Sequence, residues 1–333
     1  MKRGQVLFGM AIALLALCPL RPAFAAVNWD LYGFLGITHP DTVRLKAFSD
    51  EVKKRTNGEL TITIRPSGEL PFKANEVVRT VGEGQVQLGQ AYSVFITGSM
   101  PLMGVTGLPM FLRRTDEIQK AMPIIEKYVK KDLEKAGVKM LFGYLFPAQS
   151  LFGSGKPIRG PEDFAGRKFR TGSPQQAEML RRLGAASVAL TTPEVPVALE
   201  RGTVEGVITS AFNLVSSKWA EFTKWAYIAD FHGADIYILV NTAAYNKLPP
   251  RVRQTLDEVA KEWGHKMTQA NLASEQESLD TLRSKYRVEV FTAPKEQIDR
   301  VTDKMKDYWT AWAQQTGPDA VAMLREIRAA VGK

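Results

Sequence analysis

The stretch Asp163–Thr171 reads Asp-Phe-Ala-Gly-Arg-Lys-Phe-Arg-Thr, and its last four residues place lysine and arginine on one side and phenylalanine and threonine on the other. This period of two predicts a strand. Ser173 and Pro174 follow and match the N-cap and first residue of a helix. The sequence therefore predicts a strand that leads directly into a helix. Arg170, at the carboxyl end of that strand and beside helix N–H groups, is well placed to bind an anion.

Strands and helices alternate on both sides of this stretch. The strand patterns lie at 29–35, 60–64, 86–90, 187–190 and 204–209, and the helical patterns between them lie at 41–56, 75–83, 173–183 and 192–201. Strands separated by helices are typical of mainly parallel sheets with crossover helices, in which ligands gather at the carboxyl ends of the strands. We therefore expect an α/β fold, and 333 residues are enough for two domains.

Longer segments complete the expected fold. Residues 115–135 predict a helix and 138–145 a strand, after which 147–155, rich in small residues, is expected to cross to a second domain. The strand at 204–209 is expected to end in a loop at 210–213. Residues 251–286 show a very long helical pattern interrupted only by Gly264, which fits one helix or two. The last elements expected are strands at 236–240 and 288–291 and helices at 295–312 and 319–331.

The first 25 residues have the features of a secretory signal peptide. Lys2 and Arg3 precede a short apolar run, and Ala23-Phe24-Ala25 supplies a cleavage site. The run is shorter than the ~20 residues of a membrane span, which argues against an anchor. Cys18, the only cysteine, follows Leu17 and so lacks the small residue that lipidation requires. We expect a mature protein cleaved near Ala25, without thiols and exported to the periplasm.

The charge and the residue types exclude several classes of function. Removal of residues 1–25 takes away three positive charges, so the formal charge falls from +9 to +6. No basic patch with aromatic residues or known motif indicates nucleic-acid binding. His39, His232 and His265 are scattered, and none has a partner at the spacing of a metal pair. We expect polar contacts from His39 and His232, in loops, to the backbone. The sequence predicts no metal, no cofactor and no catalytic residues.

Aromatic residues near strand ends are the more general sign of a binding site. Trp29, Tyr92, Phe212 and Trp219 lie where loops leave predicted strands and could line a concave site with a few polar anchors. Burial in the core is the competing interpretation for each of them.

Four motifs then resemble a known family, the DctP-type solute-binding proteins of tripartite ATP-independent periplasmic (TRAP) transporters. The residues that carry the resemblance are Phe48-x-x-Glu51-Val52-Lys53-x-x-Thr56-Asn57-Gly58 with Pro66-Ser67-Gly68-Glu69-Leu70; Lys156-Pro157-Ile158 through Lys168-Phe169-Arg170; Glu194-Val195-x-x-Ala198-Leu199-Glu200-x-Gly202-x-Val204-Glu205-Gly206; and Leu248-Pro249-Pro250. The third is the most specific.

The resemblance implies a two-domain periplasmic receptor that is not an enzyme. Such a receptor closes around a small carboxylate and delivers it to the integral membrane subunits of a TRAP transporter. It also implies a hinge, a long helix spanning both domains, a first domain of residues 27–148 plus 235–276, and a second of 149–234 plus 277–333.

The resemblance implies that Arg170 is the arginine that pairs with the ligand carboxylate in most family members. It also implies that Thr209 stands at a polar position that contacts the ligand. Some family members have a second arginine where this chain has Ser150, and a tyrosine of the third motif is Pro196. We therefore expect a ligand with one carboxylate whose remainder is neutral or apolar, reached by Ser150 directly or through water. A receptor that presents the ligand to a sensor, a dehydratase-like enzyme on the same fold, and a receptor for a metal-bridged acid remain as alternatives.

Overall fold

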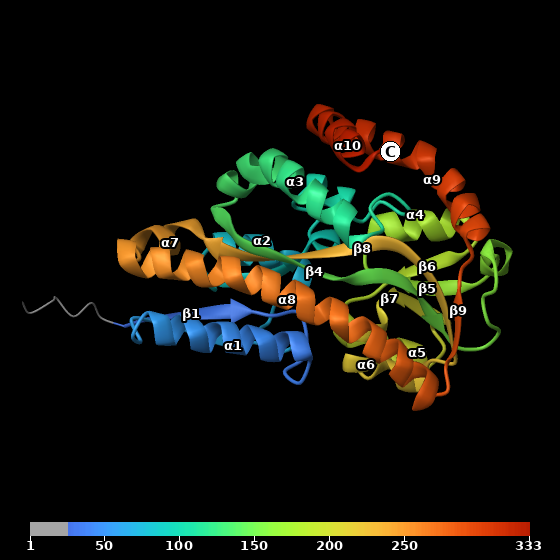
Figure 1. Ribbon diagram of the computed structural model, residues 1–333, viewed down its shortest axis with the longest axis horizontal. Coiled ribbons are helices and arrows are strands. Elements are labelled where there is room, and N and C mark those ends of the chain that lie inside the picture. Colours follow the sequence, from blue (N-terminus) through green and yellow to red (C-terminus); the bar gives the residue numbers. More distant parts are fainter. Residues whose placement is uncertain (1–25) are drawn as a thin grey trace, which may run out of the picture.

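The computed structural model describes residues 26–333, so the predicted signal peptide lies outside the described residues. Within the described part, nine strands form one mixed sheet in the order β2-β1-β3-β8-β4-β7-β5-β6, with β9 beside β8. Helices cover the sheet, which confirms the α/β class (Figure 1). No helix in this range is long and apolar enough to cross a membrane.

The N-terminal strands form the first unit, as the alternation predicted. Strands β1, β2 and β3 are parallel to one another. The elements are β1 (Val27–Tyr32), α1 (Pro40–Arg55), β2 (Leu60–Arg65), α2 (Val77–Gly82), β3 (Leu88–Tyr92) and α3 (Thr115–Lys135). His39 caps α1, because its side chain accepts a hydrogen bond from the N–H of Asp41.

Two long antiparallel strands, β4 (Val138–Gly153) and β8 (Trp225–Asn241), connect this unit to the rest of the sheet. Most of the expected crossing segment at 147–155 belongs to β4, which continues to Gly153. Pro147 is tolerated because it lies in the register shift between Phe146 and Gln149, where the ladder is already interrupted and its missing N–H is not needed. Five of the eight strand pairs are parallel, as expected, and each of the three antiparallel pairs includes β4 or β8.

The second unit contains residues 163–171, the stretch that predicted a strand leading into a helix. Strands β7, β5 and β6 are parallel. Its elements are β5 (Lys168–Thr171), α4 (Pro174–Arg182), β6 (Ala186–Ala189), α5 (Val195–Glu200), β7 (Gly206–Thr209) and α6 (Ala211–Ser216). Ser173 caps α4, with Pro174 in its first turn, as predicted. The expected loop at 210–213 is wrong, because Ser210 caps α6 by accepting from the N–H of Asn213.

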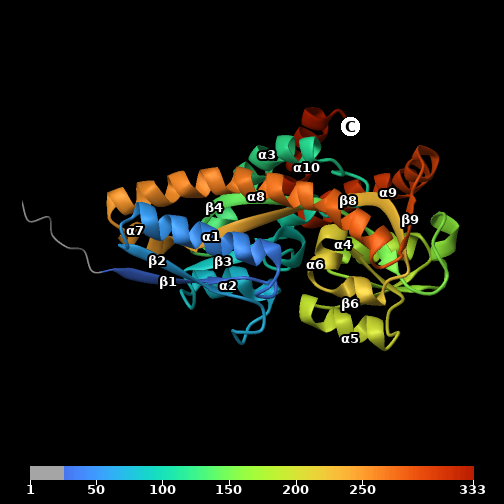
Figure 2. The ribbon, with the colours of Figure 1, turned by 60° about the horizontal axis from the view of Figure 1, so that its bottom comes forward.

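Helix α8 (Pro250–Ser284) is one continuous helix of 35 residues, which decides between the two alternatives. At 1.5 Å per residue it is about 52 Å long, and it runs along both units (Figure 2). Its Gly264 packs against β4, where an added Cβ would meet the carbonyl oxygen of Gly143 at 2.7 Å. Gly264 therefore allows the close approach of α8 to the sheet.

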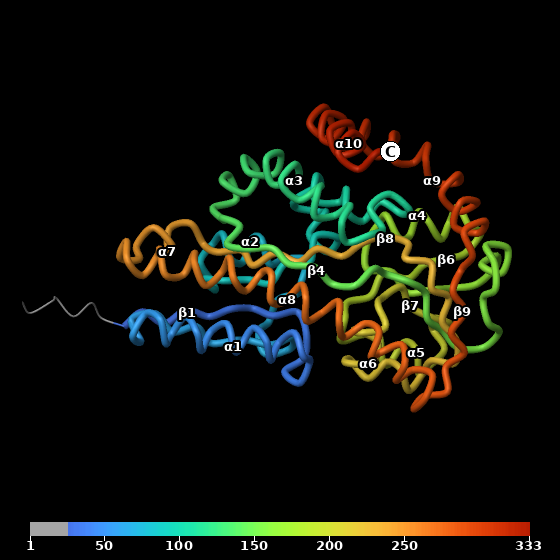
Figure 3. The backbone as a smooth tube through the Cα atoms, viewed as in Figure 1, coloured from blue at the N-terminus to red at the C-terminus, as the bar shows by residue number. Residues whose placement is uncertain are grey.

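The remaining elements are α7 (Thr242–Lys247), β9 (Glu289–Thr292), α9 (Lys295–Thr316) and α10 (Pro318–Val331). Helix α10 returns to α3, where Glu326 accepts hydrogen bonds from Lys127 and Tyr128. The C-terminal segment thus contacts both units. The tube in Figure 3 shows the chain crossing between the units in β4, β8 and α8. The exact domain boundaries stay a prediction.

Candidate functional site

Arg170, on β5, is a buried cation. Its side chain is 4% exposed, and its Nε and Nη2 donate to the carbonyl oxygen of Leu190 at 3.0 and 2.8 Å. The guanidinium carbon lies 5.9 Å from the ring centre of Trp219, a cation–π distance. These contacts hold one edge of the guanidinium and leave Nη1 without a partner among residues 26–333.

The environment of Arg170 is electrostatically unusual. Burial lowers the pKa of its guanidinium to about 10, while Tyr92 and Glu194 raise it by smaller amounts. The side chain is therefore charged at neutral pH. Within the described residues it forms no salt bridge. A buried cation without a counterion is costly, and a bound anion would offset that cost.

A small cavity of about 30 Å³ lies against Arg170. That volume is room for one or two water molecules, so the two units are close together around it. Both units and the connecting strand β4 line the cavity, with Phe34, Leu35, Tyr92 and Phe95 from the first unit, Phe146 and Gln149 from β4, and Arg170, Thr192, Thr209, Asn213 and Trp219 from the second. Arg170 is the only charged residue among them.

Aromatic rings form the wall opposite the guanidinium. The ring of Tyr92 lies 6.3 Å from that of Phe34 and 4.9 Å from that of Phe95. Phe34 and Phe95 meet edge to face at 5.6 Å. This arrangement suits the apolar body of a ligand whose charged end contacts Arg170.

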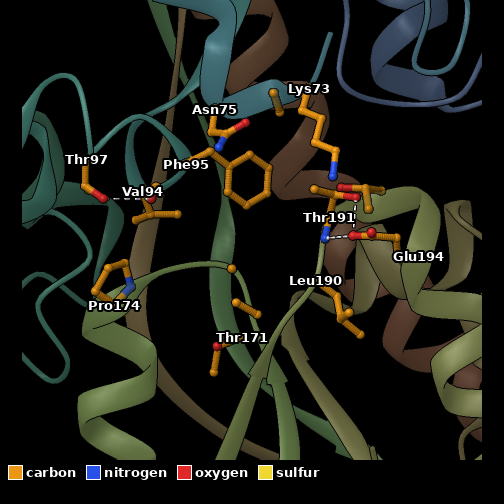
Figure 4. A pocket seen from close by; sticks show the side chains of 14 residues that line it. Lys73, Asn75, Val94, Phe95, Thr97, Thr171, Pro174, Leu190, Thr191 and Glu194 are labelled. Atoms are coloured by element: carbon orange, nitrogen blue, oxygen red, sulfur yellow. Dashed lines mark hydrogen bonds between the residues drawn. The ribbon is translucent and has the colours of Figure 1, made fainter. Parts of the chain in front are cut away.

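Wider pockets flank the cavity on two sides. One, of about 330 Å³, is lined by both units, with Phe95 from the first and Leu190 from the second. In Figure 4 the side chain of Lys73 extends across this pocket toward Thr191 and Glu194. The other, of about 310 Å³, shares Thr192 and Trp219 with the cavity. The three spaces form a cleft between the two units.

The structure brings together four of the seven residues that the sequence proposed. Arg170, Thr209, Tyr92 and Trp219 all line the cavity. Phe212 is buried just behind it, with its ring 5.7 Å from that of Phe146. The proposed site thus forms from residues that lie far apart in the sequence.

Ser150 and Trp29 lie elsewhere. The hydroxyl of Ser150 accepts from the N–H groups of Ala229 and Asp230, at 3.2 and 3.0 Å, and donates to the Asp230 carboxylate. It therefore supports the bend of β8 at Asp230, whose φ is 46°. Trp29 lines a separate groove beside Asn241. It stands near the start of β1, whereas the cavity lies beyond the end of that strand.

Sequence reasoning missed several lining residues. Phe34, Phe146 and Gln149 show no local pattern that distinguishes them from core or loop residues, and Asn213 was also missed. Asn213 donates to the hydroxyl of Thr209 at 2.9 Å, so this pair presents its polar groups together. One signal was available, because Asn213 follows the predicted strand end at Thr209.

Buried polar side chains form hydrogen bonds with the elements that surround the cleft. The carboxylate of Glu275, on α8, accepts from the N–H groups of Ala211 and Phe212 at 3.0 and 2.8 Å and so caps α6. Burial raises the pKa of Glu275 to about 7. His232 lies in β8 rather than in the expected loop, and contacts the carbonyl of Gly233 as well as the side chain of Gln176. The predicted backbone contacts of His39 and His232 are confirmed.

The described part of the chain contains no group of three histidine, cysteine or acidic side chains that could hold a metal ion. The features of the cleft are those of a binding site: a fixed cation, an aromatic wall and a few neutral polar groups.

Comparisons with known proteins identify the family and the fold of this chain. The family model described as "Bacterial extracellular solute-binding protein, family 7" (DctP) matches residues 34–315. The 2,3-diketo-L-gulonate-binding periplasmic protein YiaO of Escherichia coli is 24% identical over 295 residues, covering 87% of this chain and 89% of that protein. The C4-dicarboxylate-binding periplasmic protein DctP of Rhodobacter capsulatus is 27% identical, covering 69% and 70%. The crystal structure of DctP7, a Bordetella pertussis extracytoplasmic solute receptor binding pyroglutamic acid, superposes with a TM-score of 0.85 at 25% identity, covering 91% and 100%.

Proposed function

Since the chain belongs to family 7 of the bacterial extracellular solute-binding proteins, we propose that it captures a small monocarboxylate between its two units and delivers it to the membrane subunits of a TRAP transporter. The family consists of solute receptors of transporters rather than enzymes, so the dehydratase alternative is not retained. Its relatives are periplasmic, and the same location is proposed here, after cleavage near Ala25.

The buried, unpaired guanidinium of Arg170 is the observation that carries this proposal. Its free edge, Nη1 and the second N–H of Nη2, has the geometry for two parallel hydrogen bonds to a carboxylate. The contacts to Leu190 and Trp219 fix its orientation before a ligand arrives. A pre-oriented donor loses little side-chain entropy on binding.

The number of charges favours one carboxylate. A second carboxylate in the cavity would be buried without a cation, because Arg170 is the only charged residue that lines it. The aromatic wall suits a neutral or apolar remainder. Pyroglutamic acid, the ligand of the similar Bordetella receptor, has one carboxyl group on a neutral ring and supports this choice of ligand class.

We further propose that the ligand closes the two units. The cavity is too small for an organic acid to enter from solvent without their separation. The connections that must bend are β4, β8 and α8, and we assign residues 27–148 plus 235–276 and 149–234 plus 277–333 to the two domains. A ligand favours closure only by binding the closed form more tightly than the open form.

A thermal-shift screen of an organic-acid library tests the function. A ligand present at 100 times its dissociation constant stabilises the folded protein by about 2.7 kcal/mol. We expect small monocarboxylates to raise the unfolding temperature of the mature wild-type protein but not of Arg170→Ala. A library without any stabilising acid, or equal stabilisation of both proteins, would contradict the proposal.

A further inference from the structure

Two buried polar atoms in the cleft make no well-formed hydrogen bond within residues 26–333. Four buried side-chain polar atoms in residues 26–333 are unpaired, and two of these belong to residues that line the cleft, Oη of Tyr92 and Nε2 of His39. The side chains of both residues are more than nine-tenths buried, at 8% and 2% exposed. An unpaired buried donor destabilises the protein, so its retention at a binding cleft indicates a partner that is absent here.

The hydroxyl of Tyr92 is a donor available to the ligand. The residue ends β3, and its ring packs against those of Phe34 and Phe95, which line the cavity together with Arg170. A phenylalanine would fill the same position among these rings without an unpaired hydroxyl. Burial raises the pKa of Tyr92, with a smaller contribution in the same direction from Asp235, so the phenol keeps its proton.

The second donor is the Nε2–H of His39, and the cap of α1 fixes which nitrogen carries the proton. Nδ1 accepts from the N–H of Asp41 at 3.1 Å, so the neutral ring carries its hydrogen on Nε2. Burial lowers the pKa of His39 to about 3, with a smaller effect from Arg44 in the same direction, and the ring is therefore neutral. It donates but brings no charge.

His39 lies within reach of the Arg170 cavity. Its ring stacks on that of Phe146, at 6.3 Å, and Phe146 lines the cavity. Asn213, another lining residue, lies within hydrogen-bonding reach of the His39 ring and has a smaller, raising effect on its pKa. The pocket that His39 lines shares Thr192 and Trp219 with the cavity. A ligand whose carboxylate is at Arg170 can therefore extend toward His39.

The cleft offers no matching site for a positive charge. No carboxylate in the described part of the chain lines the cavity or the pocket of His39. Glu194 lies in the other flanking pocket, where it already accepts from Thr191. An ammonium group near Arg170 would be buried beside a cation and without a counterion.

We propose that the second polar group of the ligand is a neutral hydrogen-bond acceptor held by Tyr92 and His39, and that the cleft discriminates against amino acids. The ligand class is that of small oxo, hydroxy or lactam monocarboxylic acids. This inference rests on the proposed function and specifies the ligand of the same site.

Two triplets of probes test it with the mature protein. Pyruvate, alanine and propionate share a short chain, and pyroglutamate, proline and cyclopentanecarboxylate share a five-membered ring. In each triplet the first acid has a neutral acceptor, the second an ammonium group and the third neither. By titration calorimetry we expect the first to bind about tenfold or more tighter than the third, and the second to bind about 100-fold or more weaker than the first.

Two variants test whether Tyr92 and His39 cause the expected order of affinities. Tyr92→Phe keeps the ring, and His39→Asn keeps a capping side chain for α1. Each should weaken binding of the acceptor-bearing acid about tenfold and leave the third acid within about twofold. A purely structural role would weaken both acids alike. The unfolding temperature of ligand-free Tyr92→Phe should equal or exceed that of wild type, because an unpaired hydroxyl is removed.

The outcomes separate the two proposals. An ammonium-bearing acid that binds tightest in its triplet, equal affinities within a triplet, or no binding of any of the six acids would each overturn the inference. Unaltered affinities in both variants would overturn the roles of Tyr92 and His39. The proposed function is decided separately, by the library screen and the loss of binding in Arg170→Ala.

Discussion

Truncation of Arg170 should remove most of the affinity for the ligand. In the proposed complex, the free edge of its guanidinium supplies two charge-assisted hydrogen bonds to a carboxylate, in a site where Arg170 is only 4% exposed. Loss of one partner of a buried charge pair costs about 2–5 kcal/mol, which corresponds to a roughly 30-fold to several-thousand-fold rise in Kd. Arg170→Lys keeps the charge but loses the planar fork, so we expect an intermediate loss of about tenfold to 100-fold.

The ligand-free protein should respond differently from the complex. Arg170→Ala removes a desolvated cation but leaves the carbonyl of Leu190 without its two donors, and these effects oppose each other. We therefore expect a change of less than about 2 kcal/mol in the free energy of unfolding. Calorimetric titration with the acid found by screening gives the affinities, and urea unfolding gives the stability.

A control variant shows whether the loss is specific to the site. Arg181→Ala removes a surface arginine whose side chain is 71% exposed and pairs only with Glu178, and its Kd should equal that of wild type. If Arg170→Ala bound the acid as tightly as wild type, the assignment of Arg170 as the carboxylate partner would be refuted.

Three further predictions concern residues that support the structure around the site. Gly264→Ala should lower the free energy of unfolding by about 1–3 kcal/mol in urea, because the added Cβ meets the carbonyl of Gly143; stabilisation, as helix propensity alone predicts, would show that α8 can move away from β4. Ser150→Ala should lower stability by about 1–3 kcal/mol in the same assay, because the N–H of Asp230 loses its acceptor, while ligand affinity stays within about twofold; a large loss of affinity would restore Ser150 to the ligand site. For Glu275, the folded-state pKa of about 7 lies above the ordinary 4.5, so the carboxyl contributes most stability below pH ~4.5 and loses it as the pH rises to about 7. Unfolding of wild type and Glu275→Gln at pH 5 and 7 should therefore show wild type losing stability relative to the variant; the opposite sign would contradict the raised pKa.

The sequence predicted those features whose signal is local. Arg170 could be assigned because a two-residue period, a serine cap and a family motif all lie within a dozen residues of it. The long helix α8 was visible because its apolar spacing persists along the whole segment. In each case the physical cause and the pattern occupy the same short stretch of chain.

Features that depend on distant contacts could not be predicted in the same way. Strand β8 is buried along most of its length, so its residues show little alternation, and only 236–240 was predicted from composition. The convergence of Phe34, Gln149 and Asn213 at the cavity depends on how β4 and β8 pair across the two units. Ser150 was placed by analogy with an arginine, but its small hydroxyl bonds the backbone of β8 instead.

The division of contacts between the units bears on how a ligand could drive closure. Arg170 is held by Leu190 and Trp219, which belong to the same unit. We therefore expect its contribution to the affinity for a carboxylate to be nearly the same whether the units are open or closed. Binding that is equal in both states does not shift the equilibrium between them. In the proposed closure, the difference comes from the first unit, whose Tyr92 and Phe34 line the cavity and are expected to reach the ligand only when the units close. We therefore expect Arg170 to supply affinity in both states, and the residues of the first unit to convert part of the binding free energy into the closed conformation.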